Sequence, residues 1–271
     1  MNRQDVEEAL RHLGTAGDEG FDLFEVALTC ALHEDPSRDA GQARALLTQA
    51  AERLSASATK GRREETLAEV LAGELGLDGD LINYDHAANA DLISVAERRK
   101  GLPVALGVYY IAAARRCDLP VAGVDFPGHF LLRVETDEGP VAIDPFSHGR
   151  LVLPSELTAR ALQAGLMPGV ADQLEDLMKP VADRAVAIRL ENNIFARAAA
   201  RGDYPRAERS ALRRALIDPK DHRPWLDVAA AREGQGALAG ALQALAMAQT
   251  LDGGAAIAAR AQRERVRLKL N

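Results

Sequence analysis

A long apolar helix followed by short strands constrains this chain more than any other feature. The run from Val104 to about Cys117 is apolar on nearly every helical face, which predicts a helix buried on all sides. Pro103 suits its first turn, where a missing N–H group costs no hydrogen bond. Beyond the helix, three segments have strand character: 121–125, 129–135 and 140–144. A turn at 137–139 joins the last two strands, so we expect a small antiparallel sheet beside the helix.

The rest of the chain is predicted to be helical. Apolar residues spaced three to four apart run through most of residues 1–80 and return from about residue 182. The predicted fold class is therefore α+β and mostly helical, with three parts. These are a helical segment packed on the core (1–80), a core that holds the sheet (81–180) and an all-α region (181–271).

The all-α region contains an internal repeat. Three pairs of residues are separated by 34 positions: Gly202 and Gly236, Ala207 and Ala241, Asp218 and Asp252. This is the period of tetratricopeptide (TPR) repeats, in which paired helices turn at a small residue. We expect the last helix, from residue 255 to 270, to cap the repeats. Such repeats present concave surfaces to peptides, so we expect a protein or peptide partner here.

Composition limits the partners further. The formal net charge of −7 argues against nucleic-acid binding, which needs a basic surface. The two cysteines, Cys30 and Cys117, form neither a disulfide framework nor a metal-ligand spacing, and we expect no metal or cofactor. The chain opens with charged residues and has no apolar run of the ~20 residues that a membrane span needs. We expect a cytoplasmic protein without membrane contact.

A histidine and an aspartate on successive predicted strands form a candidate pair. They lie in the runs Pro127-Gly128-His129-Phe130 and Ile143-Asp144-Pro145-Phe146. A helix, a histidine strand and an aspartate strand follow one another in the order of a Cys-His-Asp acyl-transfer site. The helix start, where a thiolate would be stabilised, carries Pro103 instead. Cys117 lies at the far end of the helix, roughly 20 Å away.

Four runs together resemble the SirB-type bacterial proteins, which pair a transglutaminase-like core with C-terminal TPR repeats. The runs are 84–92, 97–103, 127–133 and 143–146. The resemblance implies a papain-like transglutaminase fold, whose catalytic members carry a cysteine at the helix start. Pro103 falls at that cysteine position, while His129 and Asp144 match the other two members. The chain departs from the active pattern at its nucleophile, which argues against transamidase or peptidase activity.

Five further residues are candidates for binding. Tyr84, Asp85 and Asn89 belong to an ordered loop, which borders the cleft that the resemblance implies. Arg98 either complements the C-terminal end of a helix or binds an anion, and Arg133 is either an exposed strand residue or an anion ligand.

These observations support two hypotheses about function. The first is a non-catalytic protein that acts through protein contacts as a regulator or adaptor. The second is a hydrolase or acyl transferase in which His129 and Asp144 activate water or an unrecognised nucleophile.

Overall fold

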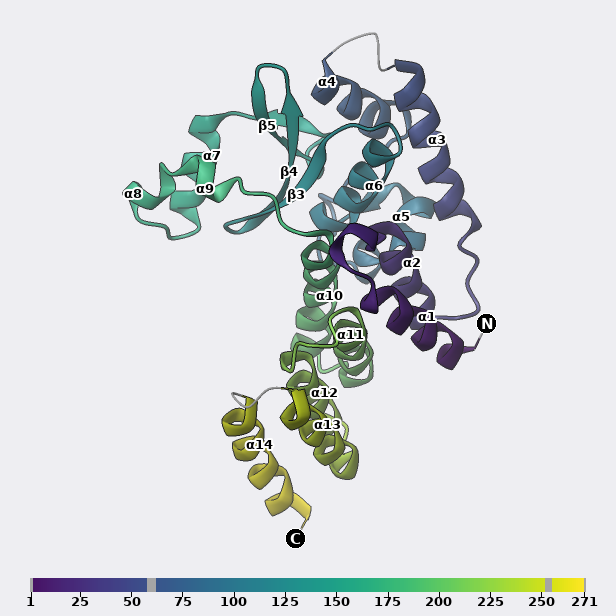
Figure 1. Ribbon diagram of the computed structural model, residues 1–271, viewed down its shortest axis with the longest axis vertical. Coiled ribbons are helices and arrows are strands. Elements are labelled where there is room, and N and C mark those ends of the chain that lie inside the picture. Colours follow the sequence, from purple (N-terminus) through teal and green to yellow (C-terminus); the bar gives the residue numbers. More distant parts are fainter. Residues whose placement is uncertain (1, 58–61, 252–254, 271) are drawn as a thin grey trace. The chain divides into compact units, whose positions relative to one another are not determined.

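The computed structural model describes residues 2–57, 62–251 and 255–270 (Figure 1). The chain forms two compact units. We call residues 39–186 the sheet unit, and residues up to 38 together with 187 onward the helical unit. The sequence predicts one helical segment over 1–80, but the structure divides these residues between the units. The α+β fold class, with a small antiparallel sheet and a helical C-terminal region, is confirmed.

The sheet unit places its helices around a four-stranded sheet. Its longer helices are α3 (Gly41–Ser57), α4 (Arg63–Ala68), α5 (Leu92–Arg98), α6 (Pro103–Arg115) and α7 (Pro154–Gln163). A π-helical turn (Glu69–Glu74) follows α4, and two short helices, α8 (Pro168–Ala171) and α9 (Leu174–Leu177), follow α7. A separate parallel pair joins β1 (Asp78–Gly79) to β2 (Lys100–Gly101). Helix α6 is buried along nearly its whole length, as its sequence predicts.

The four strands are antiparallel and follow one another in chain order. They are β3 (Val121–Phe126), β4 (His129–Thr136), β5 (Gly139–Asp144) and β6 (Arg150–Val152). Leu132 pairs with Ile143 in the β4–β5 ladder. The start of β4 and the end of β5 therefore lie at the same end of the sheet, since antiparallel neighbours run in opposite directions.

Each face of the sheet packs against a different helix. Phe130 of β4 lies against Gly107 of α6, so closely that a Cβ atom on Gly107 would come within 2.4 Å of the phenyl ring. The neighbouring Leu131 belongs to a separate apolar cluster with Leu157 and Ala161 of α7. Successive strand residues point to opposite faces, so α6 covers one face and α7 the other.

The helical unit joins the two ends of the chain. Its helices are α1 (Arg3–Thr15), α2 (Leu23–Glu34), most of α10 (Asp183–Ala200), α11 (Tyr204–Ile217), α12 (Arg223–Gly234), α13 (Leu238–Leu251) and α14 (Ala255–Leu270). Helices α1 and α2 pack against α11. This long-range packing is why the first part of the chain does not form one segment with the sheet unit.

The helical hairpins α10–α11 and α12–α13 repeat with an offset of 34 residues. The starts and the ends of α11 and α13 are separated by this number, and so are the C-terminal ends of α10 and α12. Gly202 and Gly236 both turn the chain at positive φ, 70° and 75°, a conformation that glycine adopts without strain. Ala207 and Ala241 are both buried. Asp252, a member of the third predicted pair, lies outside the described residues.

A buried ion network holds the helical unit together. The guanidinium of Arg213 on α11 is 1% exposed and donates to Glu191 of α10 at 2.9 Å and to Glu34 of α2 at 3.0 Å. Burial opposes ionisation of Glu34, but bonds from Arg209 and Arg213 hold its pKa at about 2. Both carboxylates are therefore matched by a buried cation, which a low-dielectric interior requires.

The close approach of α6 to the sheet gives a first prediction. Gly107→Ala forces Phe130 or the helix to move, so we expect the free energy of unfolding to fall by about 1–3 kcal/mol. Gly169→Ala in α8 is the control, because no atom lies within 4 Å of its Cβ position. It should be neutral or stabilising by up to about 1 kcal/mol. Urea unfolding measures both, and equal effects would contradict the packing described here.

Candidate functional site

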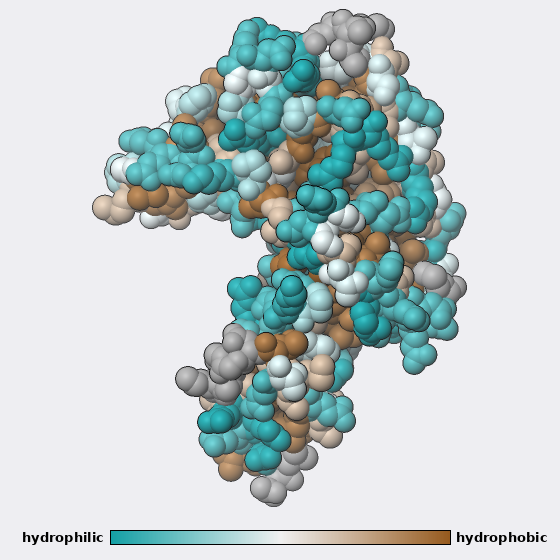
Figure 2. Space-filling view, in the orientation of Figure 1, coloured by the Kyte–Doolittle hydropathy of each residue, from teal (hydrophilic) through white to brown (hydrophobic). Residues whose placement is uncertain are grey.

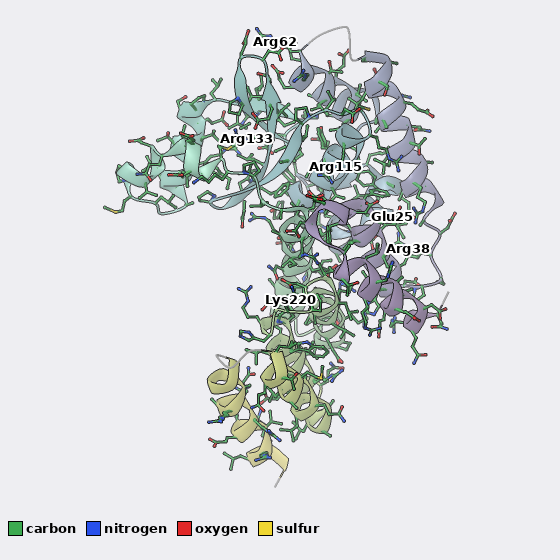
Figure 3. All side chains as sticks on the ribbon, in the orientation of Figure 1. Glu25, Arg38, Arg62, Arg115, Arg133 and Lys220 are labelled. Atoms are coloured by element: carbon green, nitrogen blue, oxygen red, sulfur yellow. The ribbon has the colours of Figure 1, made fainter. Side chains whose placement is uncertain are left out.

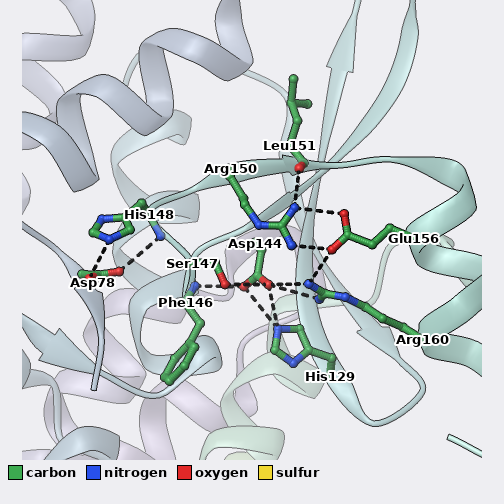
Figure 4. Close-up of polar contacts among 10 residues, drawn as sticks. All are labelled: Asp78, His129, Asp144, Phe146, Ser147, His148, Arg150, Leu151, Glu156 and Arg160. Carbon is green, nitrogen blue, oxygen red and sulfur yellow. Dashed lines mark hydrogen bonds and ion pairs between the residues drawn. The ribbon is translucent and has the colours of Figure 1, made fainter. Parts of the chain in front are cut away.

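The structure brings His129 and Asp144 together at one end of the sheet (Figure 4). His129 begins β4 and Asp144 ends β5, and Nε2 of the imidazole lies 3.2 Å from both carboxylate oxygens. With Nε2 donating to Asp144, a neutral imidazole carries its lone pair on Nδ1. Nδ1 has no hydrogen-bond partner among the described residues, and the His129 side chain is 26% exposed.

Asp144 is the centre of this arrangement. Its side chain is 1% exposed, and it accepts further hydrogen bonds from the Phe146 N–H at 3.1 Å, the Ser147 hydroxyl at 3.2 Å and both Nη atoms of Arg160 at 3.1 Å. Burial raises the pKa of Asp144, but His129 and Arg160 outweigh this effect and hold it at about 2. The carboxylate is thus ionised and saturated with donors.

Arg160 is a site residue that sequence reasoning missed. It lies on α7 and bridges Asp144 to Glu156, which also binds Arg150 of β6. The Arg150 bonds lower the pKa of Glu156 to about 2, although burial opposes this. The sequence offered one signal, the spacing of Glu156 and Arg160 four residues apart on a helix. That spacing does not reveal that Arg160 also reaches a strand carboxylate.

Neither thiol of the chain lies at the start of α6. Pro103 and the preceding Leu102 are buried there. Cys117 lies just beyond the other end of α6, where its Sγ donates to the Ala51 carbonyl at 3.2 Å. Cys30 is buried in the helical unit, and its burial, with Glu191 nearby, raises its pKa well above the ordinary value. The chain has only these two cysteines, so its candidate pair has no thiol partner.

A second histidine–aspartate pair lies beyond the end of β5. Asp78 of β1 accepts a hydrogen bond from the backbone N–H of His148 at 3.2 Å and lies 3.3 Å from its Nε2. Lys100 of β2 donates to the same carboxylate at 3.1 Å. The hydroxyl of Tyr110 on α6 is buried nearby without a partner among the described residues. Burial, together with the charges of Asp78 and Asp144, raises the pKa of Tyr110.

Two of the three predicted loop residues, Asn89 and Tyr84, border the start of α6 and the turn after Asp144. Asn89 is fully buried, donates to the carbonyls of Asn83 and Tyr84, and accepts from the Leu102 N–H at 2.7 Å. The Tyr84 ring meets Phe146 edge-on at 5.4 Å. Asp85 is exposed in the same loop.

Arg98 is used within this loop network. It donates to the Asn89 side chain at 2.7 Å and to Asp80 at 2.9 Å. The backbone N–H of Asn83, which donates to the Asp80 carboxylate at 2.9 Å, and this ion pair keep the pKa of Asp80 below its ordinary value. The structure therefore gives Arg98 an internal acidic partner.

Arg133 lies on β4 (Figure 3). The sequence suggested an exposed strand residue, but its side chain is 19% exposed. It binds Glu135 at 2.5 Å and donates to the Met178 carbonyl at 3.3 Å. The expectation of exposure is wrong because the segment after α9 passes over this position. Arg133 is not part of the contacts around Asp144.

Two further findings concern the described part of the chain, residues 2–57, 62–251 and 255–270. Within it, no three histidine, cysteine, aspartate or glutamate side chains gather in a way that could hold a metal ion. No helix there combines the length and apolarity needed to cross a membrane.

Comparison with known proteins identifies the family. A profile described as the transglutaminase-like superfamily matches residues 40–192, nearly the extent of the sheet unit. A UPF0162 protein from Xylella fastidiosa (strain 9a5c) is 33% identical over 207 residues, 74% of this chain and 73% of that protein. The chain therefore belongs to the transglutaminase-like superfamily, among the UPF0162 proteins.

More distant relatives share part of this similarity. A UPF0162 protein from Pseudomonas aeruginosa is 28% identical over 200 residues, 73% of this chain and 72% of that protein. F-box only protein 21 from Homo sapiens is 38% identical over 64 residues, 24% of this chain and 10% of that protein. No solved structure matches the chain significantly.

The buried carboxylate gives a prediction about stability and pH. Asp144→Asn removes the charge that Arg160 and His129 share, so we expect the free energy of unfolding at pH 7 to fall by about 3–5 kcal/mol. The pKa of Asp144 lies at about 2, below its ordinary 3.8. The stabilisation by this charge is therefore complete above about pH 4 and is lost as the pH falls toward 2.

Urea unfolding of the wild type and the variant between pH 7 and pH 3 measures this difference. Asp137→Asn is the matched control, since that carboxylate is 94% exposed and should change stability by less than about 0.5 kcal/mol. If the free energies of unfolding of the wild type and of Asp144→Asn differ by the same amount above and below pH 4, the assigned role of the charge is contradicted.

Proposed function

We propose that this protein is a non-catalytic member of its family and acts through protein contacts. The observation that carries the proposal is the state of the former catalytic triad. The helix start holds a buried proline, and the Asp144 carboxylate is saturated by donors from the strands, the following turn and α7. The Asp144 carboxylate, which accepts from His129 and from Arg160 of α7, then serves chiefly to join the sheet to α7.

The helical unit is the proposed contact surface. The 34-residue offset between its hairpins and the glycine turns of both hairpins support a TPR-type repeat, and with it the SirB-type architecture. Ala196 of α10 and Ala230 of α12 occupy equivalent positions in the two repeats, and both are exposed. Small side chains at equivalent positions leave room for a peptide to approach the first helices closely. We also propose that the protein resides in the cytoplasm, a compartment that suits its two free cysteines.

Blocking the surface around Ala196 and Ala230 tests the proposal. The double variant Ala196→Arg with Ala230→Arg places two long side chains on exposed helix positions that tolerate arginine. Crosslinking the full chain in a lysate of its source organism, followed by mass spectrometry, should recover a partner that the double variant loses at least tenfold. Ala246→Arg, on an exposed position of the second helix α13, should retain the partner. Equal recovery of the partner by the wild type, the double variant and Ala246→Arg would contradict a contact through α10 and α12, the first helix of each hairpin.

One observation favours a second candidate, a hydrolase that uses water. His129 has the geometry of a general base, since Asp144 orients Nε2 and Nδ1 is free to accept a proton. Such a pair activates water without a cysteine.

An activity assay separates the two candidates. We expect the wild type to show no hydrolysis or amine exchange above background on a panel of peptides, amides and esters, because no thiol or hydroxyl of the described residues is hydrogen-bonded to His129. His129→Ala is the matched control, with folding checked by circular dichroism. Turnover by the wild type that His129→Ala abolishes would overturn the non-catalytic proposal in favour of the hydrolase.

A further inference from the structure

The outer surface of α7 and α8 exposes apolar side chains that neither the core nor the candidate site uses. Leu162 at the end of α7 is 42% exposed, and Met167 and Val170 around α8 are 73% and 44% exposed. Figure 2 shows hydrophobic surface gathered over α8. We call the surface formed by Leu162, Met167 and Val170 the α7–α8 face.

The α7–α8 face rests on a well-packed base. Ala161 and Ala171, next to the exposed residues in sequence, are fully buried in the apolar cluster under the sheet, and Leu166 packs against the same cluster. The backbone that carries the exposed side chains is therefore held in place by its buried neighbours. A surface that is already ordered loses little conformational entropy when it binds a partner.

The charged residues within the segment that carries this face are acidic. Between Ala161 and Met178 the only charged residues are Asp172, Glu175 and Asp176, and all three are exposed. Asp176 pairs with Lys179 at 2.6 Å. The carboxylates of Asp172 and Glu175 form no hydrogen bond or ion pair with described side chains. A partner that covers the apolar residues would place positive charge beside these two.

The backbone of this segment excludes an added strand. The N–H groups of Ala164, Gly165 and Leu166 donate to carbonyls of α7, and those of Val170 and Ala171 donate to Met167. A partner therefore finds no free row of backbone donors to pair with, as strand addition requires. Apolar side chains on a helical surface suit instead the apolar stripe of an amphipathic helix.

We propose that the α7–α8 face binds a basic amphipathic helix of a partner protein. Apolar residues of that helix cover Met167, Val170 and Leu162, and its lysine or arginine residues lie beside Asp172 and Glu175. This surface belongs to the sheet unit, so the proposal does not depend on the contact proposed for the helical hairpins.

A pair of synthetic peptides tests this proposal on the full chain. One is an amphipathic helix of leucine and lysine, and the other has glutamate in place of lysine. Fluorescence anisotropy should show binding of the lysine peptide and at least tenfold weaker binding of the glutamate peptide. Met167→Ser removes an apolar anchor, and Glu175→Lys reverses a charge. We expect each variant to bind the lysine peptide about tenfold more weakly than the wild type.

Two control variants match these changes elsewhere on the chain. Met247→Ser removes an exposed methionine on α13, and Glu8→Lys reverses an exposed charge on α1. Both should bind the lysine peptide within about twofold of the wild type. Thermal unfolding confirms that each variant is folded. If Met167→Ser does not fold, Glu175→Lys still tests the proposal.

Four results would overturn the proposal. Equal loss in Glu175→Lys and Glu8→Lys would mean that the peptide responds only to net charge. If neither peptide binds, or if both bind equally well, the prediction of a basic amphipathic partner is wrong. Self-association of the chain in sedimentation, abolished by Met167→Ser, would assign the face to a second copy.

Discussion

The sheet unit depends on one buried carboxylate. Asp144 ends β5 with an ionised side chain from which water is almost fully excluded, a state that costs free energy unless every oxygen is paired. Its donors come from the start of β4, the turn after β5 and α7. The charge therefore determines where these three elements meet. A side chain that orients a histidine in catalysis serves equally well as the anchor of a helix.

The same requirement operates in the helical unit with the signs reversed. There the buried charge is the cation of Arg213, and the partners that satisfy it, Glu34 and Glu191, come from helices far apart in sequence. Each unit thus contains a buried ion whose charged partners come from several elements. Apolar burial supplies most of the stability, while the ions make one arrangement of elements preferable to others of similar burial.

Much of the secondary structure can be predicted from the local sequence pattern, but the contacts between distant segments cannot. Strand alternation and turn residues predicted the sheet, and the antiparallel order of β4 and β5 made the meeting of His129 and Asp144 possible. Arg160 could not be predicted, because nothing near it in sequence indicates a strand carboxylate as its partner. The exposure of Arg133 was mispredicted because its cover comes from a segment about 45 residues away. The apolar face of an amphipathic helix such as α1 indicates that the helix packs against another element. Its sequence does not show that this element is α11.

The composition of the helical unit from both ends of the chain has a consequence for biosynthesis. Glu34 leaves the ribosome long before Arg213 is made, so its buried partner is absent while the whole sheet unit, residues 39–186, is synthesised. A domain folds only when all of its parts are available. The sheet unit can therefore complete its fold first, while the surfaces of α1 and α2 that pack against α11 are still uncovered. During that interval these two helices expose apolar surface that is prone to associate elsewhere.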